Sequence, residues 1–322
     1  MKNLGCLAFA IISLLSSLVC AAEKHSMSRP FIGTQLRVVV FHDDRALVEK
    51  ELQHAWELAQ SLEAKLSDYQ PSSELMQLCA KPIKQPHPVS KDLFTVLQLA
   101  QQISAKTQGA FDVTVGDLSK AWRKRELPKL HRKVSYRDLG LDEAEQTVLF
   151  RKKLQIDLGA IGKGYIADQL MLLLQQAGLN QSAVLIGGET VLGDPPPGKS
   201  GWTIAVEDPA KSLLGTLGLA NCAVSTSGDS YQFYEVDGER LAHIFDARAS
   251  SSMNDRLSVV TIAPSAAEAD AWATALRVLG PAKAMPLASK HPRFEAMFIP
   301  FQKSPTSTLG FPKIQSHEHI SK

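Results

Sequence analysis

Apolar residues recur along the chain with spacings that predict two long helices. Between positions 45 and 69 they stand alternately four and three residues apart, which places them on one face of a helix. Positions 90–108 predict a second helix, because Ser90 is a good N-cap and Gly109 ends the pattern. Apolar stripes of this kind are typical of core packing, so we infer no function from them.

Shorter runs of β-branched or apolar residues, bounded by polar ones, predict strands. The first is Thr34–Phe41, with the sequence TQLRVVVF. Further strands are expected around 154–158, 183–186, 202–206, 222–226, 241–245 and 257–263, and helices at 164–177 and 265–279. We therefore expect an α+β (mixed α/β) fold without internal repeats, with a stiff proline-rich surface loop at 194–198.

Length and composition are those of an ordinary globular protein. The 322 residues are 44% hydrophobic and 21% charged, which suffices for one large core or two modest ones. Lys and Arg number 35 against 33 Asp and Glu, a net charge of +2. A nucleic-acid-binding protein usually has a clear basic excess, so we expect no nucleic-acid partner. Seven basic residues lie within 120–133, which we interpret as a solvated surface loop in preference to a docking face.

The first 21 residues are expected to be a signal peptide. Lys2 precedes an apolar run, and small residues around Ala21 are typical of a cleavage site. The mature domain would then span 22–322, and the protein would be exported to the periplasm. Two alternatives stay open, an uncleaved membrane anchor and lipidation at Cys20, and either would attach the protein to the inner membrane.

Two cysteines, Cys79 and Cys222, remain in the mature chain. An oxidising compartment permits a disulfide between them if the fold brings them together. Small buried apolar residues are the alternative.

Two glycine-containing segments are candidates for ligand binding. The first, GAFDVTVG at 109–116, has glycines that allow close approach of a flat ligand, and its Asp112 is either a ligand contact or a turn-forming cap. The second, DLGAIGKGY at 157–165, is predicted to run from a strand through glycines into a helix with Lys163 near its N-terminus. This arrangement indicates a phosphate-bearing ligand, and a tight turn with a solvated lysine is the alternative.

A histidine and a helix start are candidates for catalysis and metal binding. His243 is predicted to lie on a strand close to Asp246, which could orient it as a general base; a structural histidine is the alternative. Ser265 begins a capping box, and in the helix that follows Asp270 and Thr274 stand four residues apart on one face. A carboxylate and a hydroxyl are hard oxygen donors, which Mg²⁺ prefers and zinc does not.

Eight segments together resemble the ApbE family, the FAD:protein FMN transferases. They read IGT at 32–34, SDYQPSSE at 67–74, GAFDVTVG at 109–116, DLGAIGKGYIAD at 157–168, GGE at 187–189, TSGD at 226–229, HIFD at 243–246 and ADAWATAL at 269–276. Any one of them is a weak signal, but eight in the family's order are a strong one. The resemblance extends over nearly the whole mature chain, from about Phe31 to Phe298.

This resemblance implies a single T-fold-like flavin transferase domain that binds FAD and Mg²⁺. Such an enzyme moves the FMN half of FAD onto a threonine hydroxyl of an acceptor flavoprotein and releases AMP. The implied acceptors are subunits of membrane redox complexes such as sodium-pumping NADH:quinone reductase. His243 would be the base for the acceptor hydroxyl, and the metal ligands would be the side chains of Asp270 and Thr274 with the backbone carbonyl of Ala160. The implied FAD-binding residues are Ile32, Tyr69, Ala110, Phe111, Asp112, Asp157, Lys163 and Phe245.

The chain departs from the family pattern in two places. Met-Gly-Thr has become Ile32-Gly33-Thr34, which keeps an apolar wall. Asp-Pro-Arg-Thr-Gly has become DARAS at 246–250, and the loss of Pro and Gly is expected to loosen this loop. Two alternative functions therefore stay open. One is an Mg²⁺-dependent FAD pyrophosphatase that yields FMN and AMP, and the other is a non-catalytic periplasmic FAD-binding protein.

Overall fold

The computed structural model describes residues 22–126, 135–236, 238–291 and 293–315. The expected signal peptide at 1–21, with Cys20, lies outside the described residues, and so does the second half of the basic run at 120–133. Within the described part of the chain, no helix is long and apolar enough to cross a membrane.

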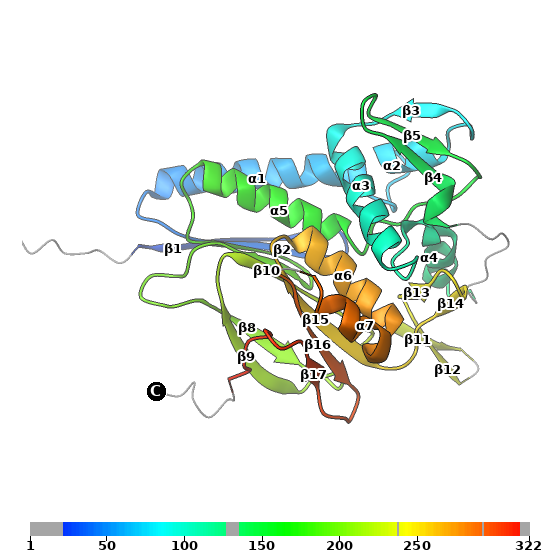
Figure 1. Ribbon diagram of the computed structural model, residues 1–322. Helices are drawn as coiled ribbons and strands as arrows, with labels where there is room; N and C mark the ends of the chain where they lie inside the picture. The colour runs from blue at the N-terminus through cyan, green and yellow to red at the C-terminus, as the bar shows by residue number, and fades with distance from the viewer. Residues whose placement is uncertain (1–21, 127–134, 237, 292, 316–322) are drawn as a thin grey trace, which may run out of the picture.

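An eight-stranded antiparallel sheet is the centre of the fold (Figure 1). Its strand order is β1-β2-β6-β7-β10-β15-β16-β17. The strands are β1 (Lys24–Phe31), β2 (Thr34–Phe41), β6 (Ser182–Ile186), β7 (Glu189–Leu192), β10 (Cys222–Ser227), β15 (Leu257–Ala263), β16 (Glu295–Pro300) and β17 (Thr306–Ser307). Every pairing in it is antiparallel. Some neighbouring strands are joined by tight turns and others by longer segments that contain helices or small hairpins, as in α+β folds.

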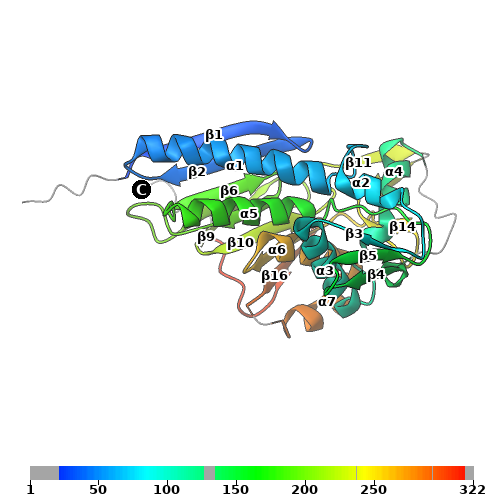
Figure 2. The same ribbon diagram turned by 90° about the horizontal axis from the view of Figure 1, so that it is seen from above.

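Helices cover one face of this sheet (Figure 2). They are α1 (Arg45–Leu66), α5 (Gly162–Gln176) and α6 (Ala266–Leu279), with α7 (Pro281–Ala288) following α6. The apolar stripe of α1 is buried against the sheet, as its spacing predicts, and the large core between helices and sheet includes Leu36, Ala59, Leu170 and Trp272. This packing fixes α5 and α6 side by side, with their N-terminal ends together.

The opposite face of the sheet is covered by a hairpin of β8 (Trp202–Glu207) and β9 (Leu213–Leu219). A second, smaller core lies there, with Val206, Leu217 and Val224 among its members. Cys79, in α2 (Glu74–Cys79), belongs to the first core and Cys222 packs against the second, and both are free thiols. Burial as small apolar residues therefore describes them better than a disulfide.

The remaining elements gather at one end of the sheet (Figures 1 and 2). Three short strands form a separate sheet beside α3 and α4, and two small hairpins face them. These elements are β3 (Pro86–Pro88), α3 (Lys91–Lys106), α4 (Gly116–Arg123), β4 (Leu139–Asp142), β5 (Thr147–Phe150), β11 (Phe233–Val236), β12 (Glu239–Ala242), β13 (Phe245–Asp246) and β14 (Ser251–Ser252).

Most of the expected elements are present, and two expected strands are wrong. Residues 154–158 have no strand pairing, because Leu154, Ile156 and Leu158 pack into the core as an irregular segment. The expected strand at 241–245 is divided into the end of β12 and the start of β13 by a bend at His243. The helix expected over 45–69 ends at Leu66, where Ser67 takes an extended backbone.

Candidate active site

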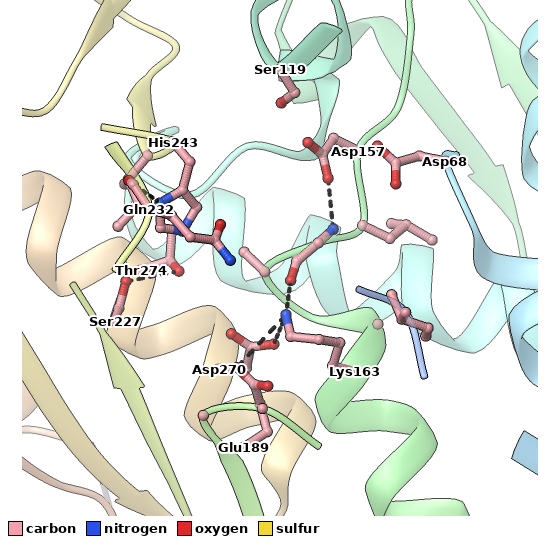
Figure 3. A pocket seen from close by; sticks show the side chains of 18 of the residues that line it. Asp68, Ser119, Asp157, Lys163, Glu189, Ser227, Gln232, His243, Asp270 and Thr274 are labelled. Carbon is pink, nitrogen blue, oxygen red and sulfur yellow. Dashed lines mark hydrogen bonds and ion pairs between the residues drawn. The ribbon is translucent and has the colours of Figure 1, made fainter. Parts of the chain in front are cut away.

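One cavity of about 700 Å³ lies where the sheet and its helices meet the elements at the end of the fold. All of the candidate site residues line it: Ile32, Tyr69, Ala110, Phe111, Asp112, Asp157, Ala160, Lys163, His243, Phe245, Asp270 and Thr274. The volume is within the range of small-molecule sites. Segments far apart in the sequence therefore build a single site, part of which Figure 3 shows.

At the floor of the cavity Lys163 faces two buried carboxylates (Figure 3). Its Nζ lies 3.7 Å from Glu189 Oε1 and 3.9 Å from Asp270 Oδ2, and it donates to the backbone carbonyl of Gly159. Glu189 is 5% exposed and Asp270 4%. Three elements supply the group, α5, β7 and α6, so its geometry depends on how these elements pack.

This arrangement holds the lysine charged and perturbs both acids. Burial alone would lower the pKa of Lys163, but the carboxylates of Glu189 and Asp270 outweigh it and raise that pKa. Burial raises the pKa of Asp270 well above the ordinary value, and the neighbouring Glu189 raises it further, while Lys163 lowers it. Burial also raises the pKa of Glu189 against the opposing effect of Lys163. With both acids ionised, one lysine would leave an excess of negative charge, so a bound cation would favour the ionised pair.

The donor set fits a hard cation. Oδ2 of Asp270 and Oε2 of Glu189 are buried without a hydrogen-bond partner, which is costly unless a ligand takes them up. The Thr274 hydroxyl, one turn further along α6, lies 3.4 Å from Ser227 Oγ. Within the described residues there is no cluster of three or more His, Cys, Asp or Glu side chains suited to a metal, so a cation here would rely on hydroxyl, carbonyl or substrate oxygens as well.

His243 lies in the opposite wall, at the bend between β12 and β13. Its Nδ1 is 3.2 Å from the backbone carbonyl of Gln232, an acceptor only, so Nδ1 carries the proton and Nε2 is left free to accept one. The Trp122 indole lies 6.0 Å from the imidazole ring and donates to the carbonyl of Leu241. Burial lowers the pKa of His243, and Lys163 and Arg277 add to this against the effect of Gln232.

The expectation that Asp246 orients His243 is wrong. Both oxygens of Asp246 accept from the Arg248 guanidinium, at 2.8 and 2.7 Å, and Oδ1 also accepts from the Arg248 amide. This bidentate pair closes the turn between β13 and β14, so the altered loop is an ordered hairpin even without the family's proline. Ser250, at the place of the family's glycine, has the left-handed backbone that glycine adopts easily, with φ of +54°.

Tyr69 stands at the mouth of the cavity with 64% of its surface exposed. The guanidinium carbon of Arg123 lies 3.8 Å from the centre of its ring. Arg123 also pairs with Asp68 and, at 3.4 Å, with Asp157, whose other oxygen accepts from the Gly159 amide. Burial raises the pKa of Asp68 to about 6, and the nearby Asp157 raises it too, against the effect of Arg123. The Arg123 guanidinium thus covers one face of the Tyr69 ring and holds the ring in place.

The glycine-bounded segment 109–116 supports the cavity wall chiefly through internal contacts. Asp112 accepts from the amide and hydroxyl of Thr114, at 2.8 and 2.7 Å, and from the Tyr136 amide at 2.8 Å. Its carboxylate therefore acts as the turn-forming cap, one of the two alternatives. A Cβ on Gly116 would lie 2.8 Å from the backbone of Gln155, so this glycine permits close approach of another chain segment.

The lysine of the 157–165 segment differs from its expected role in one respect. Its charge is directed at Glu189 and Asp270 instead of standing free for a phosphate. The helix that it begins, α5, starts at Gly162, and no side chain caps this N-terminus. A helix start of this kind attracts anions through its own amides. The segment still fits a phosphate-bearing ligand, with the helix terminus as the attracting group.

Several cavity residues escape sequence reasoning. Glu189 stands in the quoted GGE segment, but nothing in its spacing relates it to Asp270. Arg123 lies within the basic run that was interpreted as a solvated loop, and that interpretation is wrong for this residue. Trp122 and Gln232 contact or orient His243 without any motif to mark them. A buried acid near a lysine is visible only once the chain is folded.

Comparisons with known proteins agree with this geometry. Residues 32–298 match the sequence profile described as the ApbE family. An FAD:protein FMN transferase from Escherichia coli is 32% identical over 68% of each chain, and one from Haemophilus influenzae is 30% identical over 90% of this chain and 91% of that one. The crystal structure of the flavinyl transferase ApbE of Pseudomonas stutzeri has 27% identity and a TM-score of 0.80, and covers 90% of this chain and 96% of that one. The flavin transferase ApbE of Vibrio cholerae, 26% identical with a TM-score of 0.79, covers 89% and 98%.

Proposed function

Because this chain belongs to the ApbE family, we propose that it is an enzyme that moves the FMN half of FAD onto a threonine hydroxyl of an acceptor flavoprotein, with release of AMP and with Mg²⁺ as cofactor. Relatives named FAD:protein FMN transferase support the flavin transfer. The observation that carries the proposal is the convergence of all the candidate residues on one cavity, with an acid pair at its floor and a free histidine nitrogen in its wall.

His243 is the base in this proposal. A threonine hydroxyl is a poor nucleophile until its proton is removed. Gln232 fixes the tautomer with the proton on Nδ1, so Nε2 can accept the hydroxyl proton. The lowered pKa keeps the imidazole neutral near pH 7, which is the form that can act as a base.

Asp270, Thr274 and the carbonyl of Ala160 would hold Mg²⁺, and Glu189 fits as a further carboxylate beside them. When bound, the ion would neutralise charge that develops on the phosphate oxygens. Lys163 keeps Asp270 and Glu189 together before the ion arrives, since its ammonium faces both. The uncapped N-terminus of α5 lies on the same side of the cavity and adds attraction for the pyrophosphate.

The isoalloxazine or adenine ring of FAD would stack on Tyr69. One face of this ring is covered by Arg123, and its large exposed area leaves surface for a ligand. Phe111 and Phe245 are buried in the cavity wall and exclude water from the inner part of the site. Ile32, at the tip of the β1–β2 hairpin, adds an apolar contact near the mouth.

A mass measurement tests the proposal. Residues 22–322 are incubated with FAD, Mg²⁺ and a flavoprotein domain that carries an acceptor threonine, such as a subunit of sodium-pumping NADH:quinone reductase. We expect the domain to gain the mass of one FMN group and AMP to be released. AMP and free FMN without the gain would support the pyrophosphatase alternative, and intact FAD would support the non-catalytic binder.

Variants in α6 give this test its control. Asp270→Ala removes a proposed metal ligand, so labelling should stop, and we expect EDTA to stop it as well. Glu268→Ala, two residues earlier in the same helix and outside the cavity, should label normally. Undiminished labelling by Asp270→Ala would remove this residue from the metal site.

We also propose that the protein is exported. A signal peptide at 1–21 would place the enzyme in the periplasm, where it would meet the proposed acceptor subunits of membrane redox complexes. Cleavage is checked by N-terminal sequencing of the protein purified from periplasmic extract, and an intact Met1 would contradict it.

A further inference from the structure

A second cavity, of about 320 Å³, adjoins the candidate active site. The segment 228–233 stands between the two. Its residues Tyr231 and Gln232 line the first cavity, while Ser230 and Phe233 line the second. The second cavity therefore lies behind the strip of chain whose Gln232 carbonyl orients His243. Nothing in the proposed reaction uses it.

Cations on aromatic rings dominate the lining of this second cavity. Arg240 and Arg256 place their guanidinium carbons 3.4 and 3.3 Å from the ring centres of Phe233 and Phe301. Lys211 Nζ lies 4.3 Å from the ring centre of Tyr231. A guanidinium stacked on a ring keeps its N–H edge directed outward, which is the geometry that binds a carboxylate with two hydrogen bonds.

The acids nearby neutralise only part of this positive charge. Asp229 is shared by Arg240, at 3.0 Å, and by Arg277, at 3.4 Å. Within the described part of the chain, Lys211 and Arg256 have no ion-pair partner, and Arg256 Nε is buried without a hydrogen bond.

Two acids lie on the neighbouring β8–β9 connection, and among the described residues neither forms an ion pair with Lys211 or Arg256. Glu207 accepts from the Tyr231 hydroxyl at 2.7 Å, and Asp208 accepts from the amides of Ala210 and Ser212. Neither lines the second cavity. The cavity thus presents unpaired positive charge to whatever enters it.

Size and position narrow the choice of occupant. The cavity has less than half the volume of the first one, so it suits one or two side chains and not a second FAD. The strip 228–233 lies between His243 and the second cavity, so an acceptor protein whose hydroxyl reaches His243 would extend along this strip. A neighbouring part of the same acceptor would then lie near Lys211 and Arg256.

We propose that this cavity binds an acidic segment of the acceptor protein, whose carboxylates pair with Lys211 and Arg256. The inference rests on the proposed flavin transfer, since it names the chemistry of the acceptor. It makes Lys211 and Arg256 determinants of acceptor choice, separate from the residues that hold FAD.

Direct binding of a peptide probe tests the cavity. The probe is a short fluorescein-labelled peptide of alternating Glu and Ser, with a Gln and Ser peptide as the neutral control, and fluorescence anisotropy is the measurement. We expect the acidic peptide to bind and to weaken as NaCl rises from about 50 to about 300 mM. Lys211→Glu and Arg256→Glu should each weaken it by about tenfold. Lys199→Glu reverses an exposed lysine outside the cavity and should not.

Two results would overturn the inference: equal binding of the neutral peptide, or unchanged binding by Lys211→Glu. Both residues have a positive φ, but Arg256 also has a buried Nε, so its variant could fail to fold. The Lys211 side chain is exposed, so Lys211→Glu keeps the test decisive. Thermal melting and FAD binding are measured for each variant to confirm the fold.

The labelling assay separates this inference from the proposed function. With the flavoprotein domain as acceptor, Lys211→Glu should raise the KM for the domain about tenfold and leave the KM for FAD unchanged. If the wild type transfers FMN and Lys211→Glu has the same KM for the acceptor domain, the binding of an acidic segment is refuted and the proposed flavin transfer is not. Absence of transfer by the wild type would refute the flavin transfer and, with it, the acceptor as the occupant.

Discussion

The contact between α5 and α6 at Gly164 offers a sharp test of how the site is built. A Cβ added to Gly164 would lie 2.3 Å from the carbonyl oxygen of Ala266 and 2.7 Å from the amide nitrogen of Ala267. These are backbone atoms and cannot swing aside. Ordinary contact begins near 3.4 Å, so Gly164→Ala must move the start of α6 by about 1 Å.

That movement lowers the free energy of unfolding in two ways. Overpacking of this kind costs about 1–3 kcal/mol, and helix propensity returns up to about 1 kcal/mol when Ala replaces Gly. Asp168 accepts from the amides of Ala266 and Ala267, at 2.7 and 2.9 Å, and a lost bond to a charged group costs about 1.5–3 kcal/mol. We expect a net destabilisation of about 2–3 kcal/mol.

The effect on activity should exceed the effect on stability. Asp270 is one turn inside α6, so a shift at the helix start changes its position relative to Lys163. Misplacement of a reacting group by about 1 Å can reduce the rate about a hundredfold. We therefore expect Gly164→Ala to lower kcat/KM for flavin transfer by about two orders of magnitude and the melting temperature by about 5 °C.

Gly162→Ala is the matched control for stability, because its Cβ would meet only the Leu158 side chain at 3.5 Å. It should melt at or above the temperature of the wild type. Melting is followed by circular dichroism, and transfer by the mass assay. This expectation is refuted if Gly164→Ala has the same melting temperature as Gly162→Ala and a kcat/KM for transfer within about twofold of the wild type. The close approach of α5 and α6 would then not position Asp270.

The surroundings of His243, Ser250 and Asp229 lead to three further predictions. The pKa of His243 is lowered, so its neutral form persists below pH 6.5. In a pH profile of transfer, kcat/KM should therefore fall toward acid with a midpoint below 6.5. A midpoint above 6.5 would exclude His243 as the base. Ser250→Gly should stabilise the protein by about 0.5–1 kcal/mol, since Ser250 has a φ of +54°, and unchanged or lower stability in urea unfolding would count against the turn. Asp229→Ala should destabilise by about 3–5 kcal/mol, because it removes a fully buried carboxylate shared by Arg240 and the fully buried Arg277. Asp255→Ala removes an acid that is 45% exposed and leaves Arg277 with Asp229, so it should cost clearly less; equal losses in urea unfolding would contradict this account.

The spacing of apolar residues predicted those helices and strands that bury one long apolar face. The stripe of α1 and the run Leu257–Ala263 are examples, because each presents a long apolar surface to the core. Strand β1 gave only a weak signal, since Met27 and Phe31 are the only large apolar residues in KHSMSRPF and Pro30 interrupts it. The strand forms because it pairs along its whole length with β2. The alternating apolar and polar residues at 154–158 wrongly predicted a strand, because a segment buried on one side without strand pairing has the same sequence pattern.

The candidate site was predictable where family motifs mark it and not elsewhere. Asp270 and Thr274 share a helix face that spacing alone reveals. Glu189 joins Asp270 only through the packing of β7 against α6, and Gln232 reaches His243 through its backbone, which no side-chain motif records. Ile32 was predicted as an apolar wall, but its φ of +45° in the two-residue β1–β2 turn is a feature that only the backbone discloses.

The scattered origin of the cavity walls has a consequence for how the protein matures. Ile32 comes from the first hairpin, while Asp270 comes from a helix laid down after most of the sheet. Contacts of such long range form late, because the chain entropy of closing large loops opposes them. A partly synthesised chain therefore has no complete cavity, and a ligand of this cavity would stabilise only the finished fold.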